Sequence, residues 1–466
     1  LSLVGSEMCI RDSPNGMRPS VGLSANLKKH GLEILRFKTG TPSRVDRRSL
    51  HMDKMELEEG DPENHAFSFM SERKDRNKRN CWLTYTNEKT HEIIRENIMR
   101  APKYAGKIHG IGARYCPSIE DKVVRFADKD RHQLFVEPEG LDTTEMYVQG
   151  MSTSMPIDVQ YAFLRTIPGF EDVKMMRPAY AIEYDLLDPL QLYPTLEVIK
   201  LPGLYSAGQS NGTSGYEEAA AQGLVAGINA ALKIQGKDPF ILARHEAYIG
   251  SLVDDLVTKG ADEPYRMMTS RSEYRLILRQ DNADLRLTEK GHSIGLVGEE
   301  RYARFLERKK KYEEAMDYIR TQRFTPKEEI NRALESMGTA PLTTGTGADQ
   351  ILKRPEMTYR KMMEILGCPS FDEEAVEEME ITVKYEGYIA RQEAAVRKAA
   401  RMENEKLPLD MDYLSLDGIS TEARQKMDKI RPLSLGQAAR IPGVSPADIS
   451  VLMVYVKQRK GKKGAE

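Results

Sequence analysis

Cys116 is the side chain best placed to act as a nucleophile, because basic residues surround it in the sequence. Arg114 precedes it, and Lys122 and Arg125 follow. Nearby positive charge lowers the pKa of a thiol and increases the fraction present as thiolate. Pro117 restricts Cys116 to an extended backbone, which would present the sulfur at a loop tip. On these residues alone an inert core cysteine is the commoner interpretation, and a reactive thiol is the alternative.

A second candidate site is the glycine-rich stretch GQSNGTSGYEEAAAQG at residues 208–223, directly behind the apolar run at 201–207. Gly208, Gly212 and Gly215 allow sharp turns and close approach of the backbone to a ligand. The pattern predicts a strand over 201–207, then a glycine turn, then a helix. Doubly wound nucleotide-binding folds are built this way, although a glycine turn alone is equally compatible with a purely structural role.

The helix predicted from Tyr216 would point its free N–H groups at whatever occupies the crevice. Ala219, Gly223 and Gly227 recur at every fourth residue. This spacing predicts a nearly bare helical face that packs tightly on a sheet.

Other patterns predict the elements that must position these residues. Ser118 and Asp121 have the spacing of a capping box, which predicts a helical turn after Cys116. Alternation over 123–127 and 132–137 predicts strands. Beyond Lys237 the chain is rich in long amphipathic, charged stretches, which predict helices.

Composition sets bounds on the function. A chain of 466 residues can form two to four domains. A formal net charge of -2 argues against indiscriminate binding of nucleic acid, so RNA would have to contact local basic patches. The four cysteines, Cys9, Cys81, Cys116 and Cys368, are widely spaced, which predicts a reducing cytoplasm and no structural metal site. No run approaches the roughly 18 apolar residues of a membrane span.

Three basic patches are candidates for RNA contact. They are Arg271, Arg275, Arg279 and Arg286; Arg301, Arg304, Arg308 and Lys309–Lys311; and Arg391, Arg397, Lys398 and Arg401. For any one patch the commoner interpretation is a solvated helix face balanced by nearby acids. The sequence does not choose among them.

Several long strings, in order, resemble the MnmG family, also called the glucose-inhibited division protein A family. They are RFKTGTPSR at 36–44, CWLTYTNEKTH at 81–91, GARYCPSIEDK at 112–122, RPAYAIEYD at 177–185, GQSNGTSGYEEAAAQG at 208–223 and TSRSEYRL at 269–276. The resemblance runs from about Arg18 to Lys457. It implies an FAD-dependent tRNA uridine 5-carboxymethylaminomethyl modification enzyme.

The implied fold is α/β: an FAD-binding doubly wound fold of glutathione-reductase type, with an inserted mixed α/β domain and a C-terminal all-helical domain. The opening GxGxxG turn of such flavoproteins is missing, and residues 1–16 match nothing in the family. We therefore expect a non-native segment there and an FAD domain incomplete at its N-terminus; a signal peptide is the alternative, but a continuous apolar core is lacking. The expected domains are 1–16, non-native; 17–35, remnant of the FAD domain; 36–163, inserted NAD and substrate domain; 164–236, second part of the FAD domain; 237–406, helical domain; and 407–466, helical tRNA- and partner-binding subdomain.

The implied reaction joins a methylene carbon from methylenetetrahydrofolate, and the nitrogen of glycine or ammonia, to carbon 5 of the wobble uridine. FAD and NADH would serve as cofactors, and the GTPase MnmE as partner to a homodimer within a heterotetramer. The resemblance makes Cys116 the expected catalytic thiol. Two alternatives remain: a folate- and FAD-dependent tRNA uridine methyltransferase, against which the tail from Lys237 argues, and a non-catalytic fragment that binds tRNA or a partner.

The resemblance also implies binding residues. Those expected to bind FAD are Gly208, Gln209, Asn211, Gly212, Gly215 and Glu217. Those expected to bind the nicotinamide dinucleotide are Gly112, Arg114, Tyr115, Pro117, Ser118, Glu120, Asp121, Lys122, Arg125 and Phe126. Those expected to contact nucleic acid are Lys38, Arg44, Arg271, Arg275 and Arg279.

Overall fold

The computed structural model describes most of the 466-residue chain, which divides into two compact units. The described residues are 22–60, 66–71, 77–114, 117–408 and 410–463. Unit 1 consists of Leu1–Phe67, Glu72–Ile241 and Asp255–Met267, and unit 2 consists of Ser68–Ser71, Leu242–Asp254 and Met268–Glu466.

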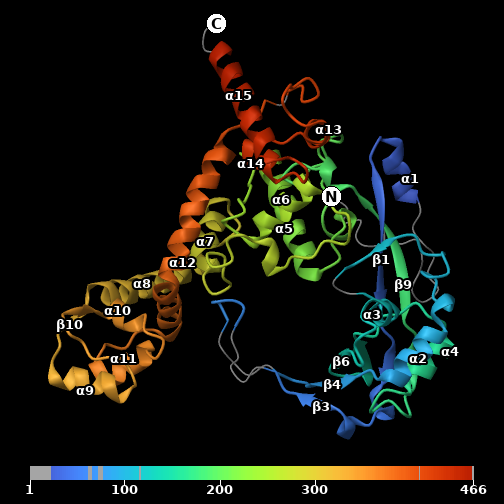
Figure 1. The fold of residues 1–466 in the computed structure, drawn as a ribbon, viewed down its shortest axis with the longest axis horizontal. Helices are drawn as coiled ribbons and strands as arrows, with labels where there is room; N and C mark the ends of the chain where they lie inside the picture. The colour runs from blue at the N-terminus through green and yellow to red at the C-terminus, as the bar shows by residue number, and fades with distance from the viewer. Residues whose placement is uncertain (1–21, 61–65, 72–76, 115–116, 409, 464–466) are drawn as a thin grey trace. The chain divides into compact units, whose positions relative to one another are not determined.

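A three-stranded sheet in unit 1 has β1 (Ile34–Thr41) at its centre. This strand pairs in parallel with β5 (Ile111–Gly112) and antiparallel with β9 (Tyr180–Leu187). Figure 1 shows β1 and β9 running side by side. Phe37 and Lys38, consecutive residues of β1, are both buried. Since successive residues of a strand point to opposite faces, both faces of β1 are covered.

A six-stranded antiparallel sheet forms the rest of the β structure of unit 1. Its order is β3 (Glu56–Glu58), β4 (Cys81–Tyr85), β6 (Gln133–Pro138), β7 (Glu145–Gln149), β2 (Arg44–Asp46) and β8 (Met175–Arg177). The helices before and around it are α1 (Gly22–Lys29), α2 (Glu88–Glu96), α3 (Ile119–Arg125) and α4 (Ile157–Leu164). Strand and helix side chains such as Val136, Val148 and Phe163 share one apolar core.

The prediction of a strand over 132–137 is confirmed by β6, but the prediction over 123–127 is wrong, because α3 continues to Arg125. Here the helix start behind Ser118, with Glu120 and Asp121 in the first turn, overrides the apparent alternation. Ser118 is the N-terminal cap residue as predicted, although its side chain makes no capping hydrogen bond.

The prediction of a strand over 201–207 is also wrong. Pro202 and Gly203, the latter with a φ of 91°, produce a turn in which the Leu204 N–H donates to the Leu201 carbonyl. Only an isolated bridge between Glu197 and Tyr205 remains of the expected pairing.

The helix predicted from Tyr216 is confirmed as α5 (Tyr216–Ile234). The prediction that its small-residue face packs on a sheet is wrong. Gly223 and Gly227 are exposed, and nothing lies within 4 Å of a Cβ built on either. The buried face of α5 carries Glu218, Gln222 and Asn229 among its apolar residues.

The helices predicted beyond Lys237 are confirmed. They are α6 (Tyr248–Lys259), α7 (Ala283–Ser293), α8 (Glu299–Thr321), α9 (Glu328–Ser336), α10 (Ala348–Leu352), α11 (Tyr359–Leu366), α12 (Glu373–Asn404), α13 (Thr421–Ile430), α14 (Leu435–Arg440) and α15 (Pro446–Lys463), with one small hairpin of β10 (Arg323–Phe324) and β11 (Thr346–Gly347). No helix in the described part of the chain is long and apolar enough to cross a membrane.

Unit 2 contains two separate apolar cores. Met379 and Val383 of α12 belong to the first core, and Met402 near the other end of α12 packs against the second. Figure 1 shows α12 as the long helix that extends from the first group of helices to α14 and α15.

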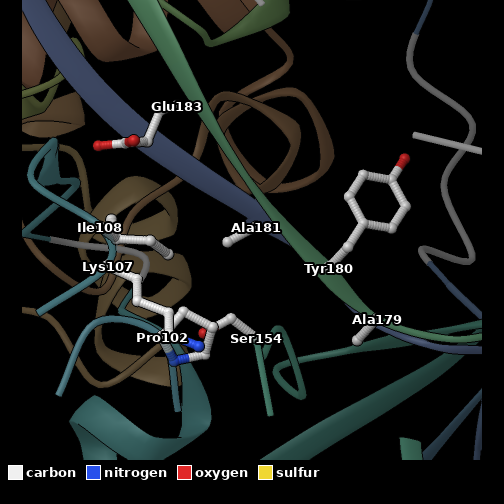
Figure 2. A pocket seen from close by; sticks show the side chains of 8 residues that line it. All are labelled: Pro102, Lys107, Ile108, Ser154, Ala179, Tyr180, Ala181 and Glu183. Atoms are coloured by element: carbon white, nitrogen blue, oxygen red, sulfur yellow. The ribbon is translucent and has the colours of Figure 1, made fainter. Parts of the chain in front are cut away.

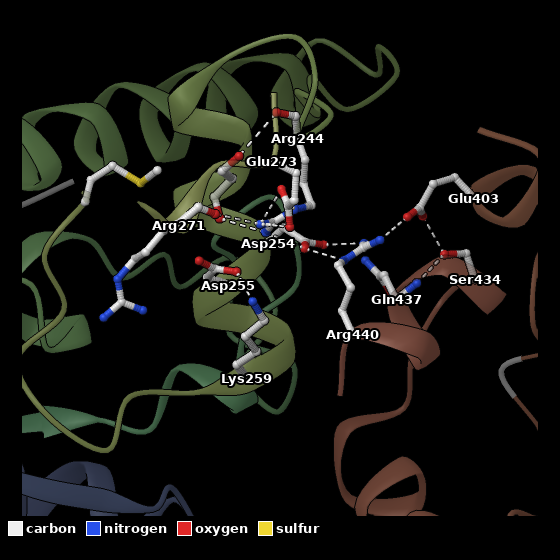
Figure 3. Close-up of polar contacts among 12 residues, drawn as sticks. Arg244, Asp254, Asp255, Lys259, Arg271, Glu273, Glu403, Ser434, Gln437 and Arg440 are labelled. Atoms are coloured by element: carbon white, nitrogen blue, oxygen red, sulfur yellow. Dashed lines mark hydrogen bonds and ion pairs between the residues drawn. The ribbon is translucent and has the colours of Figure 1, made fainter. Parts of the chain in front are cut away.

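An ion-pair network joins α14, α12, the loop that carries Glu273 and the segment that carries Arg244 and Asp254 (Figure 3). The Arg440 guanidinium of α14 donates to both carboxylate oxygens of Asp254, each at 2.7 Å, and also pairs with Glu403 of α12. Arg244 pairs with the same Asp254 at 3.1 Å and with Glu273 at 2.9 Å.

Candidate functional site

The glycine turn needs glycine at two positions. Gly208 and Gly212 have φ values of 74° and 78°, in the left-handed region that side chains disfavour. A Cβ on Gly212 would lie 2.8 Å from Leu186 Cδ1 and 2.9 Å from Phe37 Cε2. Phe37 of β1 therefore packs directly against the turn.

Three fully buried polar side chains surround this turn: Asn211, Thr213 and Gln222. Gln222 Oε1 accepts hydrogen bonds from the Gly208 N–H at 2.9 Å and from Asn211 Nδ2 at 3.1 Å. Asn211 Oδ1, Thr213 Oγ1 and Gln222 Nε2 have no hydrogen-bond partner in the described part of the chain. Since unpaired buried polar atoms are costly and rare, their gathering at one turn fits a polar ligand with both donors and acceptors.

The start of α5 already carries negative charge. Glu217 is exposed, whereas Glu218 is buried and accepts hydrogen bonds through Oε1 from the Met267 N–H at 2.8 Å and from Arg266 Nε at 3.2 Å. Carboxylates in the first turn occupy the position where a helix dipole favours an anion. This helix start therefore suits a neutral polar group better than a phosphate.

A second buried polar cluster lies around β1 and the start of α3. Lys38 is 6% exposed, and its Nζ lies 3.8 Å from Asp121 Oδ2. Asp121 Oδ1 accepts hydrogen bonds from Lys103 Nζ at 2.5 Å and from Tyr104 Oη at 3.0 Å. A Cβ on Gly112 would come within 2.7 Å of Lys38 Cε, so glycine at this position lets β5 pass over the lysine.

Burial controls the electrostatics of this cluster. It lowers the pKa of Lys38, although the charges of Asp121 and Glu120 oppose the shift. Burial raises the pKa of Asp121, but the hydrogen bond from Lys103 and the charge of Lys38 outweigh it, so the pKa stays below its ordinary value. The pKa of Tyr104 is raised to about 12, through burial first and the charge of Asp121 second.

A cavity of about 360 Å³ lies beside this cluster (Figure 2). It is lined by Pro102, Lys107, Ile108, Ser154, Ala179, Tyr180, Ala181 and Glu183. Ser154 links the cavity to the cluster, because its N–H and hydroxyl both donate to Glu120 Oε1 at 3.2 Å. Glu120 is fully buried, and its Oε2 has no hydrogen-bond partner among the described residues. Cavities of this size are typical of small-molecule sites.

The expected nicotinamide-binding stretch is only partly gathered at this cluster. Gly112, Glu120 and Asp121 lie there, Ser118 is buried, and Lys122 Nζ donates to the Gly150 carbonyl at 3.2 Å. Arg114, Arg125 and Phe126 are exposed, and Pro117 is half-buried. Tyr115 and the expected nucleophile Cys116 lie outside the described residues.

Three of the five expected nucleic-acid contacts are engaged inside the protein. Lys38 is buried as described above. Arg44 pairs with Glu139 at 2.7 Å and lies 4.6 Å from the centre of the Tyr147 ring. Arg279 pairs with Asp281 at 2.9 Å and with the buried Glu378. Their geometry favours structural roles over contact with phosphate.

Sequence reasoning missed Thr213, Glu218 and Gln222 at the glycine turn, and Lys103 and Tyr104 at the buried cluster. Glu218 and Gln222 carried a usable signal, because polar side chains four residues apart fall on one helical face, here among the buried positions of α5. Lys103 and Tyr104 carried none, since their contact with Asp121 spans 18 and 17 residues.

Comparisons with known proteins identify the family. A family model described as glucose inhibited division protein A matches residues 2–238, so the expectation that residues 1–16 match nothing in the family is wrong for residues 2–16. Models described as the tRNA modifying enzyme MnmG/GidA C-terminal helical domain and C-terminal helical bundle match residues 299–393 and 395–466.

Similar proteins agree with the family models. The tRNA uridine 5-carboxymethylaminomethyl modification enzyme MnmG of Caldicellulosiruptor saccharolyticus is 56% identical over 452 residues, covering 97% of this chain and 72% of that protein. The enzyme of the same name from Enterococcus faecalis is 54% identical over 462 residues, covering 98% and 73%.

A solved structure of Aquifex aeolicus GidA superposes with a TM-score of 0.84 at 44% identity, covering 95% of this chain and 70% of that one. The predicted fold class, a mixed α/β region followed by a helical C-terminal domain, is thus confirmed. The chain belongs to the glucose-inhibited division protein A family, the MnmG family of tRNA uridine modification enzymes.

Proposed function

We propose that this protein binds FAD at the glycine turn and uses it to modify the wobble uridine of tRNA. The observation that carries the proposal is the set of buried, unpartnered polar atoms on Asn211, Thr213 and Gln222, next to two glycines in left-handed conformations. The edge of a flavin ring presents carbonyl acceptors and an N–H donor, which these amide and hydroxyl groups complement.

The residues of the turn would bind and orient the cofactor. A bound flavin would supply a hydride acceptor and donor. Gln222 is held by the Gly208 N–H, so its Nε2 is presented as a fixed donor, while Asn211 Oδ1 is presented as an acceptor. Because the contacts from Met267 and Arg266 hold the Glu218 carboxylate in place, negative charge at the start of α5 would disfavour a phosphate there.

NADH and methylenetetrahydrofolate are the remaining small molecules of the proposal. The cavity beside Ser154 and the buried Lys38–Asp121 pair support a ring-binding site close to the segment that resembles the family's nicotinamide-binding stretch. Cys116 is proposed to add to carbon 6 of the uracil, since carbon 5 is a poor nucleophile until the ring is activated. The assignment of Cys116 rests on the sequence resemblance.

The partners of the proposal follow the family resemblance. They are tRNA as substrate, the GTPase MnmE, and a second copy of this chain in a homodimer within a heterotetramer, with the reaction in the cytoplasm. The matches to residues 299–393 and 395–466 support this function over a folate-dependent methyltransferase without a helical tail.

Retention of FAD tests the proposal. The purified chain, mixed with FAD and passed through gel filtration, should retain flavin absorbance. Gly212→Ala should abolish retention, because its Cβ would press on Phe37 and Leu186. The matched control is Gly223→Ala, which adds the same atom to an exposed position of α5 and should retain FAD. Chain that retains FAD should then form modified uridine in tRNA when MnmE, GTP, NADH, methylenetetrahydrofolate and glycine are supplied, and Cys116→Ser should lose this product while still holding FAD.

Failure of the unmodified chain to retain FAD would refute binding at this turn. Retention without any modified uridine would restrict the proposal to a flavin-binding protein, and equal retention by Gly212→Ala and Gly223→Ala would place the cofactor elsewhere.

A further inference from the structure

Among the described residues, the middle of α12 contributes no side chain to either apolar core of unit 2. The buried residues of this helix are Ala375, Glu378, Met379 and Val383, all in its first 11 positions. From Tyr385 to Arg401 the side chains are exposed or half-buried. Two large aromatic side chains, Tyr385 and Tyr388, are 47% and 55% exposed. Neighbouring aromatic side chains that leave this much apolar surface in water are candidates for contact with a partner.

The same stretch of α12 carries exposed cations that have no carboxylate partner among the residues that the structure describes. Arg391, Lys398 and Arg401 are exposed and form no ion pair in the described part of the chain. The two acidic residues between Tyr385 and Arg401 are in ion pairs, Glu386 with Lys353 at 2.6 Å and Glu393 with Arg397 at 3.8 Å. The remaining charge on this stretch of helix is therefore positive.

Most cations of the other basic patches differ in this respect, because they are paired or bonded within the protein. In the patch on α8, Arg308 pairs with Asp284 and Glu374, and Lys309, Lys310 and Lys311 pair with their own acids. The remaining two cations of that patch contact the segment at 69–70: Arg301 lies 5.0 Å from the centre of the Phe69 ring, and Arg304 donates to the Met70 carbonyl at 3.4 Å. In the patch at 271–286, Arg279 is paired as described, and Arg286 donates to the carbonyl groups of Glu246 and Arg279. Charge that is neutralised within the protein attracts a polyanion weakly.

Tyr385, Tyr388, Arg391, Lys398 and Arg401 are named here the α12 surface. Since successive residues of a helix are about 100° apart, Arg391, Lys398 and Arg401 lie within about 80° of one another around the helix axis, and Tyr388 and Tyr385 follow beyond Arg391 in steps of about 60°. The Arg391 guanidinium lies 4.6 Å from the centre of the Tyr388 ring, and the rings of Tyr388 and Tyr385 are 6.4 Å apart. Exposed cations that adjoin exposed aromatic rings form a combination that can bind RNA, the cations through its phosphates and the rings through stacked bases.

The α12 surface continues onto the loop at 269–275. Gln392, the neighbour of Arg391 in the chain, donates through Nε2 to the Glu273 carbonyl at 3.2 Å. Arg275, two residues further along that loop, is exposed. In Figure 3 the Arg271 guanidinium points away from the network of Arg244, Asp254 and Arg440. The contact thus joins the first and third basic patches of unit 2.

We propose that the α12 surface, together with Arg275, is where this protein holds its tRNA substrate. The proposal rests on the proposed tRNA modification and names the contact within it: phosphates at Arg275, Arg391, Lys398 and Arg401, and an unpaired base stacked on Tyr388. It selects these cations over the paired cations of α8.

Binding of unmodified tRNA by the full chain, measured by fluorescence anisotropy over a series of salt concentrations, tests the proposal. The double variant Arg391→Ala and Lys398→Ala should weaken binding at least about tenfold and reduce the salt dependence of log K by about 1 to 2. Tyr388→Ala should weaken binding about fivefold or more, whereas Tyr388→Phe should bind as the unaltered chain does.

The matched control removes two equally exposed cations of unit 2 that have carboxylate partners. Lys310 and Arg332 have side chains 76% and 75% exposed, and each pairs with a glutamate four residues away. Lys310→Ala with Arg332→Ala should bind tRNA as the unaltered chain does. All variants should keep the same unfolding temperature and the same FAD retention.

The outcomes separate the two levels of the argument. If the unaltered chain modifies tRNA and the α12 variants bind it as tightly as the control, the inference is overturned and the proposed function stands. If the α12 variants lose only the association with MnmE, the surface docks a protein and the inference is again overturned. If the unaltered chain neither binds nor modifies tRNA, the proposed function itself fails.

Discussion

The role of Lys38 in the structure differs from the role expected from the sequence. In the sequence it stands in a basic loop and is expected to contact phosphate. In the structure it is buried beneath Gly112 and faces Asp121, which is also held by Lys103 and Tyr104. Burial lowers its pKa, which is the opposite of what a phosphate partner would do. Lys38 is therefore a structural cation whose partner is within the same unit.

Substitutions of this pair should have unequal effects. Asp121→Ala removes the acceptor shared by two lysines and should cost about 3 to 5 kcal/mol of unfolding free energy, the range for breaking a buried ion pair. Lys38→Met keeps the aliphatic stem and leaves Asp121 with Lys103 and Tyr104, so it should cost about 1 to 2 kcal/mol. Urea unfolding can follow the fluorescence of Trp82, the single tryptophan, which packs on the core of unit 1.

The tRNA affinity of the folded Lys38→Met variant provides a second readout. It should equal that of the unaltered chain. A large loss of tRNA affinity with little loss of stability would restore Lys38 as a contact to nucleic acid.

At the scale of elements, the segment 81–91 is a structural joint between β4 and α2. Asn87 and Thr90 form a reciprocal cap at the start of α2. Thr86 Oγ1 accepts a hydrogen bond from the His132 N–H at 2.7 Å, so its own proton is available to His91 Nε2 at 2.8 Å. Burial lowers the pKa of His91 and favours the neutral ring, so we assign Nε2 as the acceptor and place the ring proton on Nδ1.

This joint should weaken in acid. Burial lowers the pKa of both His91 and His132, and their rings are 5.1 Å apart. When the pKa of a base is lower in the folded state, the unfolded state binds more protons below the ordinary pKa of about 6.5. The contribution is therefore fully present above pH 6.5 and declines as the pH falls from there toward the folded pKa.

His132→Phe keeps a ring of similar shape and removes one of the two titrations. Between pH 7 and pH 5, the midpoint of unfolding followed by Trp82 fluorescence should fall more for the unaltered chain than for His132→Phe. Parallel pH profiles for the two proteins would show that His132 is not a buried neutral base.

Sequence patterns predicted those elements whose determinants are local. The helix α5, the strand β6 and the helical character beyond Lys237 all follow from periodicity. The strand predicted at 123–127 failed because the helix that starts behind Ser118 continues to Arg125, and the one at 201–207 failed because Pro202 and Gly203 set the turn. The glycine turn was predictable as a turn, but its unpartnered polar atoms depend on Gln222, a full 11 residues after Asn211.

At the scale of the whole molecule, the described residues of unit 1 share one apolar core and those of unit 2 form two. Unit 2 also has the ion-pair network of Arg440, Asp254, Arg244 and Glu403, which we call the polar lock. Arg440 connects α14 to Asp254 and to Glu403 at the end of α12, and Ser434 donates to Glu403 at 2.6 Å. Burial lowers the pKa of Arg440, but its bonds to the two carboxylates outweigh this and raise it. The lock thus fixes a charge that stays protonated at every physiological pH.

Removing this guanidinium should loosen unit 2. Arg440→Met should cost roughly 3 kcal/mol, the lower end of the range for broken buried pairs, because Asp254 keeps Arg244 as a partner. Thermal unfolding followed by circular dichroism at 222 nm, a helix-sensitive wavelength, can measure the loss. Lys310→Ala is the surface control and should stay within about 0.5 kcal/mol of the unaltered chain. Equal stability of the two variants would show that the lock contributes no net stability.

The position of α12 between two cores also constrains the length of this helix. Because both ends of the helix are anchored in cores while the stretch between them belongs to neither, the fold constrains the number of residues in this stretch. Each residue lost or gained would rotate one anchor against the other by about 100° and shift it by about 1.5 Å. Changes in length should therefore be tolerated only as whole turns, so the length of this helix sets the spacing and relative rotation of the two cores of unit 2.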